Sequence, residues 1–305
     1  MIPTPEATVG AVLSLRSGAE SVVQYVPPTG AVNDVWHLSG GLAPVLGAQE
    51  GVIASKFKGL MAPGKPITQQ TARADGDVWL DTVYDPMEID FTATIYGNTP
   101  WSFRSIHGSW FDSWSMYAAG RLNWFTANRG EWWCYVRQGK EIGDELTLGP
   151  GPIGSQSYAW VAKTEGIPFW RSFDSTDKWD PQTASASGFV RLLNRGAIPS
   201  WPTYIAQGPF ALLTLGDGLS GATVTFGPLA AGQAVKIVTQ PNERSIVEIT
   251  TSTNLYSLLS GRFATPLPGV GDKPSWARIP VSITGATPGV TSIVAAVTPY
   301  RLWPE

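Results

Sequence analysis

The sequence contains few of the residues that enzymes and metal proteins use for their chemistry. Among its 305 residues there is one cysteine, Cys134, and there are two histidines, His37 and His107. A single cysteine excludes a disulfide within the chain, and two histidines cannot make a His-rich zinc site. We therefore expect neither a metal nor a cofactor.

Charge is also scarce. Asp, Glu, Lys and Arg make up 15% of the chain, whereas about 25% is typical of soluble proteins. The 21 basic and 24 acidic residues give a net charge of −3, which disfavours binding to nucleic acid or to an anionic membrane. Because a monomer normally keeps charge on its surface to remain soluble, we expect part of this surface to be buried in an assembly.

Long hydrophobic runs are missing as well. The longest chargeless stretches, Gly196 to Gly216 and Ile279 to Tyr300, are each interrupted by prolines, which favour connections between short strands over a membrane-spanning helix. The first residues lack the basic and apolar regions of a secretory signal. We expect that the chain does not insert into a membrane. We also expect it to be assembled in the cytoplasm.

The patterns that are present predict a mainly β fold. In Met87–Tyr96, the apolar residues Ile89, Phe91, Ala93 and Ile95 alternate with polar ones, which is typical of a half-exposed strand. Many other short valine-rich or aromatic runs end at a glycine or proline, as strands do.

One segment has a helical period. In Pro100–Tyr117 the aromatic residues, Trp110 and Trp114 among them, recur at helical spacings after the cap sequence Asn98-Thr99-Pro100, so we expect a helix here. We interpret both tryptophans as packing or interface residues.

A hairpin should follow this helix. Arg121–Ala127 and Glu131–Gln138 flank Asn128-Arg129-Gly130, in which glycine is available for a positive φ. Trp132 and Trp133 are adjacent in the second strand, so their side chains must point to opposite faces of the sheet. We expect the helix to cover one of them and a second subunit to cover the other.

Asp174–Ser187 is the best candidate for a linker, because it combines mixed charge, a proline and a tail of small residues. It divides the chain into a domain over 1–173 and a domain over 188–305. In the second domain, short strands about 8–12 residues apart predict a β-sandwich. In the first domain, 40–74 is predicted to be a loop with one strand at 51–60.

Catalytic and ligand-binding interpretations are weaker than structural ones. His37 lies next to a tryptophan inside a strand and His107 lies in the aromatic helix, where structural roles are favoured. Gly59–Lys65 resembles a phosphate-binding loop, but a proline replaces its final hydroxyl residue. An enzyme, for example a cell-wall hydrolase, ranks third, below the structural and the glycan-binding hypotheses that are given at the end of this section.

Acidic residues give no calcium motif either. Asp75, Asp77, Asp81 and Asp85 lack the spacing of an EF-hand, so we interpret them as a solvated turn with carboxylates that flank strands.

One segment of the second domain contains an N-x-G turn, an aromatic-proline step, a strand and then Gly-Pro. These features are carried by Asn194, Gly196, Trp201, Pro202 and Gly208. They resemble a recurrent stretch in the distal tail proteins and minor tail proteins of long-tailed, non-contractile bacteriophages. In the first domain, MEIDFTATIYG, the aromatic helix, GRLNWF, WWCYVR and IPFWR look like the ring-forming domain of the same family.

The resemblance implies a fold and a function. It implies an N-terminal split-barrel-like β domain with one helix and a C-terminal galectin-like β-sandwich. It also implies a non-enzymatic protein of the virion tail tip that forms a hexameric ring, joins the tail tube protein to the tail-tip hub protein, and leaves a channel through which genomic DNA passes. A tape measure protein is a further candidate partner.

The alternative is a glycan-binding module or receptor-binding protein for attachment to the host surface. The second domain contains three tryptophans, Trp201, Trp276 and Trp303, and no evident His-Asn-Arg-Trp sugar-binding group. The structural hypothesis is therefore favoured.

Overall fold

The structure, a computed structural model, forms two compact units. The first extends to Trp170 and also includes Leu302–Glu305, and the second comprises Arg171–Arg301. Each unit has its own hydrophobic core. The residues that the structure describes are 21–28, 35–45, 47–70, 76–140, 154–271, 273 and 275–305.

A curved antiparallel sheet organises the first unit, in the strand order β2-β1-β7-β8-β9-β6-β3. Its end strands, β2 and β3, contact each other without hydrogen-bonded pairing, so the sheet curves without closing. The two-residue strand β10 lies where the first unit ends. The bounds are β1 Val22–Val26, β2 Trp36–Ser39, β3 Gly51–Lys58, β6 Glu88–Tyr96, β7 Gly120–Thr126, β8 Gly130–Gln138, β9 Ser155–Thr164 and β10 Trp170–Arg171.

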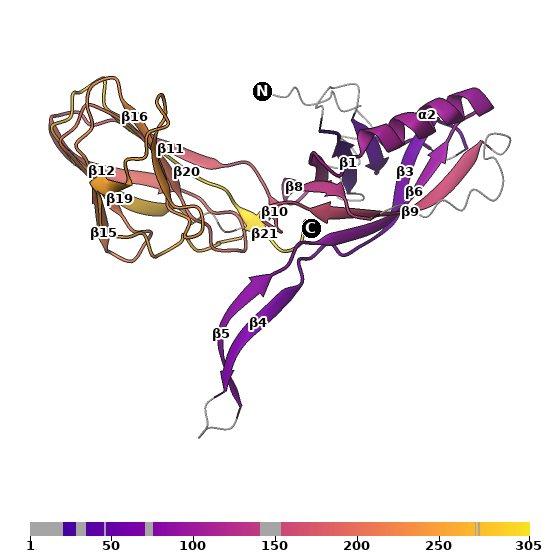
Figure 1. Cartoon of the computed structure of the whole chain (residues 1–305), viewed down its shortest axis with the longest axis horizontal. Coiled ribbons are helices and arrows are strands. Elements are labelled where there is room, and N and C mark those ends of the chain that lie inside the picture. Colours follow the sequence, from indigo (N-terminus) through magenta and orange to yellow (C-terminus); the bar gives the residue numbers. More distant parts are fainter. Residues whose placement is uncertain are drawn as a thin grey trace. The chain divides into compact units, whose positions relative to one another are not determined.

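Helix α2, Pro100–Ser113, lies against β6 and β3 (Figure 1). Thr99 caps it, since its hydroxyl accepts a hydrogen bond from the Ser102 N–H at 3.0 Å and the Ser102 hydroxyl accepts one from the Thr99 N–H. The helix ends before its predicted C-terminus, because Trp114 adopts an extended backbone. The indole of Trp114 stacks instead on Tyr25, with ring centroids 3.9 Å apart.

An aromatic cluster fills the space between α2 and the sheet. Trp110 is fully buried, and its ring centroid lies 5.4 Å from that of Trp36, 5.1 Å from that of Trp160 and 5.5 Å from that of Trp114. Such edge-to-face and tilted pairs add to the free energy gained by burying the rings. The two tryptophans of the predicted helix therefore lie in the core of the first unit.

The predicted hairpin is present as β7 and β8, with Gly130 at φ 72°. Trp132 points into the aromatic core. Trp133 points to the opposite face, where the Arg121 guanidinium lies 5.1 Å from the centre of its ring. Both indoles are buried within the chain, 1% and 7% exposed. So little of either ring is exposed that these fractions give no support to the expectation of a second subunit over one of them, which stays a prediction.

A two-stranded antiparallel arm projects from the first unit (Figure 1). It consists of β4, Gly64–Gln70, and β5, Asp77–Tyr84. The prediction of a loop over 40–74 is thus corrected, because this range contains β3, as expected, and also β4. Every residue of β4 is exposed, so no apolar alternation marks it as a strand.

The second unit is a sandwich of two five-stranded antiparallel sheets, in the orders β11-β20-β13-β16-β17 and β12-β19-β14-β15-β18, as predicted. The inward-facing residues of both sheets form one core. The bounds are β11 Ser175–Trp179, β12 Ser185–Leu192, β13 Thr203–Gln207, β14 Leu212–Gly216, β15 Thr223–Phe226, β16 Ala234–Val238, β17 Ser245–Glu248, the 3-10 helix η2 Tyr256–Leu258, β18 Leu259–Ser260, β19 Ala277–Thr284, β20 Ser292–Val297 and β21 Tyr300–Arg301.

The predicted linker at Asp174–Ser187 is corrected by the structure. This segment forms β11 and the start of β12, and each strand joins the edge of a different sheet of the sandwich. An edge strand carries polar residues on its open side, which explains why its composition resembles that of a linker.

Replacement of Trp133 by alanine tests the packing on the second face of the first sheet. We expect Trp133→Ala to lower the free energy of unfolding by about 3–5 kcal/mol, because it removes a buried indole. Trp101→Ala is the matched control, since the Trp101 side chain is 82% exposed and its loss should change stability by less than about 0.5 kcal/mol. Denaturant unfolding measures both, and equal effects would contradict the assignment.

Candidate interaction surfaces

The histidines and the cysteine are engaged in packing. The Nδ1 atom of His37 lies 3.0 Å from the Gln24 amide nitrogen, and the Nε2 atom of His107 lies 2.7 Å from the Tyr158 hydroxyl. Burial lowers the pKa of both histidines. Cys134 is buried, and its burial raises the pKa of the thiol, so the reactive thiolate is disfavoured.

The acidic residues that the sequence groups together are spread along the arm. Asp81 accepts a hydrogen bond from the Thr82 N–H at 2.7 Å, and Asp85 forms an ion pair with Lys65 at 2.5 Å. Asp77 lies at the far end of β5, and Asp75 lies outside the described residues. Within the described ranges, no three His, Cys, Asp or Glu side chains are close enough to hold a metal ion.

The segment that resembles a phosphate-binding loop forms the root of the arm. Leu60 and Ala62 are buried there, and the Leu60 carbonyl accepts a hydrogen bond from the indole N–H of Trp170 at 2.7 Å. The Asp85 N–H donates to the Pro63 carbonyl at 3.0 Å. The first contacts attach the residues before β4 to the core of the first unit, and the last one joins the two sides of the arm at its root.

Beyond its root, the arm exposes apolar side chains on both faces. Val78 and Trp79 are consecutive in β5, so they point to opposite faces, whereas Leu80 lies at a bulge where the register of the two strands shifts. Large exposed apolar patches mark surfaces that bind a partner, and a two-stranded ribbon has no core of its own to bury them. The exposed fractions are 44% for Ile67, 53% for Val78, 62% for Trp79, 53% for Leu80 and 50% for Val83.

In the second unit, Asn194 of the predicted motif lies at the centre of a buried hydrogen-bond network. Its side-chain nitrogen donates to the carbonyls of Ile198 and Leu267 at 2.9 and 3.1 Å, and its side-chain oxygen accepts from the Gly196 N–H at 3.0 Å. A Cβ at Gly196 would lie 2.3 Å from the Tyr300 carbonyl oxygen. Both residues therefore shape this turn.

The other motif residues also have structural positions. Trp201 is half-buried and packs on the sandwich core, and the Pro202 carbonyl accepts a hydrogen bond from the Thr239 hydroxyl at 2.6 Å. A Cβ at Gly208 would lie 2.4 Å from the Ala230 carbonyl oxygen. The motif thus brings together residues that hold connections of the sandwich in place.

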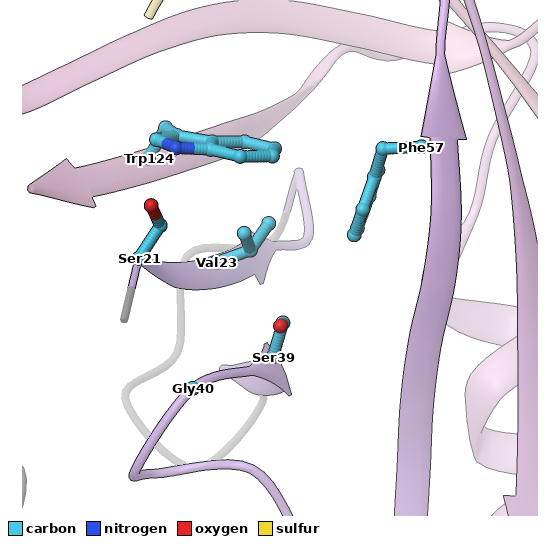
Figure 2. A pocket seen from close by; sticks show the side chains of 6 residues that line it. All are labelled: Ser21, Val23, Ser39, Gly40, Phe57 and Trp124. Atoms are coloured by element: carbon cyan, nitrogen blue, oxygen red, sulfur yellow. The ribbon is translucent and has the colours of Figure 1, made fainter. Parts of the chain in front are cut away.

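A pocket of about 410 Å³ lies beside β1, β2 and β3 in the first unit. Its lining residues, shown in Figure 2, are Ser21, Val23, Ser39, Gly40, Phe57 and Trp124. The rings of Phe57 and Trp124 meet edge to face, with centroids 5.3 Å apart. The Ser21 hydroxyl and the Trp124 indole N–H both donate to the Glu305 carboxylate, at 2.5 and 3.1 Å. The chain itself thus satisfies two polar groups of this pocket.

No helix among the described residues is long and apolar enough to cross a membrane.

The contact of Trp170 with the root of the arm can be tested by removing the indole N–H. We expect Trp170→Phe to lower the free energy of unfolding by about 1–3 kcal/mol, because the Leu60 carbonyl loses its buried donor. Protease cleavage in β4 and β5 should also become faster. Trp160→Phe is the control, because the buried Trp160 indole N–H has no hydrogen-bond partner. Equal rates of protease cleavage within β4 and β5 in the two variants would refute this role.

The histidines predict a dependence of stability on pH. Both have a pKa below the ordinary value in the folded chain, so the unfolded chain binds protons more readily below about pH 6.5. The free energy of unfolding should therefore fall as the pH falls through this range. A His37→Gln, His107→Gln double variant should lose less stability between about pH 7.5 and pH 5 than the wild type. Parallel urea-unfolding curves at the two pH values check this, and identical losses would contradict it.

The sequence matches no family model, and no curated protein sequence matches it. Among solved structures, the chain is similar to the Dit protein of phage SPP1, described as a paradigm of the hub adsorption apparatus in phages that infect Gram-positive bacteria, with a TM-score of 0.56 and 12% identity over 91% of this chain and 98% of that chain. It is also similar to a chain of the phage P2 baseplate in its activated conformation with Ca, with a TM-score of 0.48 and 9% identity over 92% of this chain and 98% of that chain. The chain therefore has the mainly β fold of a distal tail protein, in agreement with the resemblance of its sequence.

Proposed function

We propose that the chain is a structural component of a bacteriophage tail tip, in which six copies of it form a ring. The ring joins the tail tube protein to the tail-tip hub protein and leaves a channel for DNA. The fold shared with the SPP1 Dit protein supports this role, and the observation that carries it is the apolar arm of β4 and β5.

A closed ring of head-to-tail contacts would cover every arm. In a head-to-tail contact, the arm of each subunit covers a different surface on its neighbour. When such contacts close into a ring, every arm has a partner and no exposed ribbon remains to aggregate. Burial of the side chains around Trp79 would supply the free energy for this contact.

The charge of the chain suits a DNA conduit. A channel wall rich in Lys and Arg would bind the phosphates of the genome and slow its passage, whereas this chain has a net charge of −3. We propose that genomic DNA passes without specific binding. The tape measure protein, which would lie in the same channel, is a further partner.

The proposal places the protein in the virion, at the tail tip, after assembly in the host cytoplasm. It assigns no catalytic activity to the chain. The buried position of Cys134 supports this, because burial raises the pKa of its thiol and disfavours the nucleophilic thiolate.

Light scattering on the purified chain over a range of concentrations tests the ring. We expect a species with six times the mass of the chain, and we expect the double variant Trp79→Ser, Leu80→Ser to stay monomeric with an unchanged melting temperature, since both side chains are exposed. Trp101→Ser, at another exposed tryptophan, is the control and should still assemble. A wild-type chain that remains monomeric throughout, or arm variants that assemble normally, would refute the proposal.

A further inference from the structure

We propose that the outer face of the sheet containing β12 and β19 binds an anionic polymer rich in hydroxyl groups, with Arg191 and Arg278 as the residues that bind its negative charges. This site lies in the second unit and goes beyond the proposed ring, which uses the arm of the first unit.

The two arginines form an unneutralised pair. Arg191 and Arg278 lie directly opposite each other on neighbouring strands, and both are exposed, whereas their neighbours Val190, Leu192 and Ile279 are buried. Like charges in this position destabilise a sheet. Among the described residues, no Asp or Glu forms an ion pair with either arginine.

The Asp177 carboxylate is hydrogen-bonded to the main chain of Arg191 and forms no ion pair with its guanidinium. The Asp177 carboxylate accepts a hydrogen bond from the backbone N–H of Arg191 at 2.6 Å, so its contact is with the main chain. Two guanidinium groups without a carboxylate form a site for an anion, because each can donate two parallel hydrogen bonds to a phosphate or a carboxylate.

Next to the arginines lies an apolar platform. The Arg278 guanidinium lies 4.5 Å from the centre of the Phe189 ring, and Phe189 is 47% exposed. Phe189 lies opposite Pro280, which is also exposed. An exposed aromatic face beside a proline ring offers a flat surface on which the C–H groups of a sugar or polyol can stack.

A row of hydroxyl groups continues from the platform across the whole sheet. The register places five Ser or Thr residues side by side, one on each strand, and the chain neighbours of the three central ones, on β19, β14 and β15, are buried in the core. With strands about 4.8 Å apart, the row is about 19 Å long. None of these hydroxyls forms a hydrogen bond with a described protein group. The row consists of Ser187, Ser282, Thr214, Thr225 and Ser260.

Together these features select the chemistry of the ligand. Each free hydroxyl can both donate and accept, which complements a chain of sugar or polyol hydroxyls. The buried centre of a protein interface is more apolar than this face, on which the hydroxyls and the two arginines outnumber Phe189 and Pro280. The arginine pair adds the requirement for negative charge. The occupant is therefore a polyhydroxyl polymer that carries phosphate or carboxylate groups.

Isothermal titration calorimetry on the full chain tests the site with three probes: poly(glycerol phosphate), polygalacturonate and uncharged dextran. We expect at least one anionic polymer to bind with an affinity that falls as salt is added, and dextran to bind far more weakly. Binding of only one anionic polymer identifies its phosphate or its carboxylate as the group that is recognised.

Variants assign the binding to these residues. Arg191→Gln and Arg278→Gln should each weaken binding about tenfold or more, since each removes charge-assisted hydrogen bonds. Thr214→Val should weaken it less, by removing one hydroxyl of the row. Arg262→Gln, at another exposed arginine of the same unit, is the matched control and should bind as the wild type does. The melting temperature should not fall in any of the four, and removal of one of the two facing charges should raise it slightly.

Three results would overturn the proposal: no binding of either anionic polymer, equal binding of dextran, or an equal loss in Arg262→Gln. Equal binding of a single-stranded DNA probe would also overturn it, because this would show general attraction of polyanions. Arm variants that do not assemble should bind the polymer normally, so failure of the ring and failure of this site can be distinguished.

Discussion

A two-stranded β-ribbon has no interior, and this constraint governs the role of the arm in this protein. Side chains on either face of the β4–β5 ribbon can be covered only by something outside the ribbon. The arm nevertheless carries a tryptophan, a leucine and two valines at exposed positions of β5. Such side chains cost solubility unless a partner covers them, so the arm is suited to an assembled state.

The arm can project only because its root is held firmly. Its first strand begins after Leu60 and Ala62, which are buried, and the Trp170 indole holds the Leu60 carbonyl. In the first unit, α2 packs its aromatic residues on the curved sheet and forms a core to which the arm contributes at its root, through Tyr84. Assembly energy can therefore come from the arm while the fold of the unit depends on the cluster around Trp110.

The elements that could be predicted from the sequence are those with one buried face. The alternation in β6, the glycine turn before β8 and the evenly spaced strands of the sandwich all follow from burial on one side. By contrast, β4 is exposed on both faces, so its composition suggested a loop, and β11 is an edge strand whose polar residues suggested a linker. The aromatic helix was predicted, but its end depends on the stacking of Trp114 on Tyr25, a contact distant in sequence.

The same limit applies to the surface that we propose as a binding site. Arg191 and Arg278 become neighbours only through the register of β12 with β19, and the hydroxyl row exists only because four separate pairings align its members. Because the overall charge is low, few other charges surround the arginine pair. The pair therefore dominates the electrostatic potential of the surface around it. The arm and the arginine face also differ in chemistry. Burial of apolar side chains favours a lasting contact, whereas a salt-sensitive polar face favours a reversible one. One chain can therefore combine permanent assembly through its first unit with transient recognition through its second.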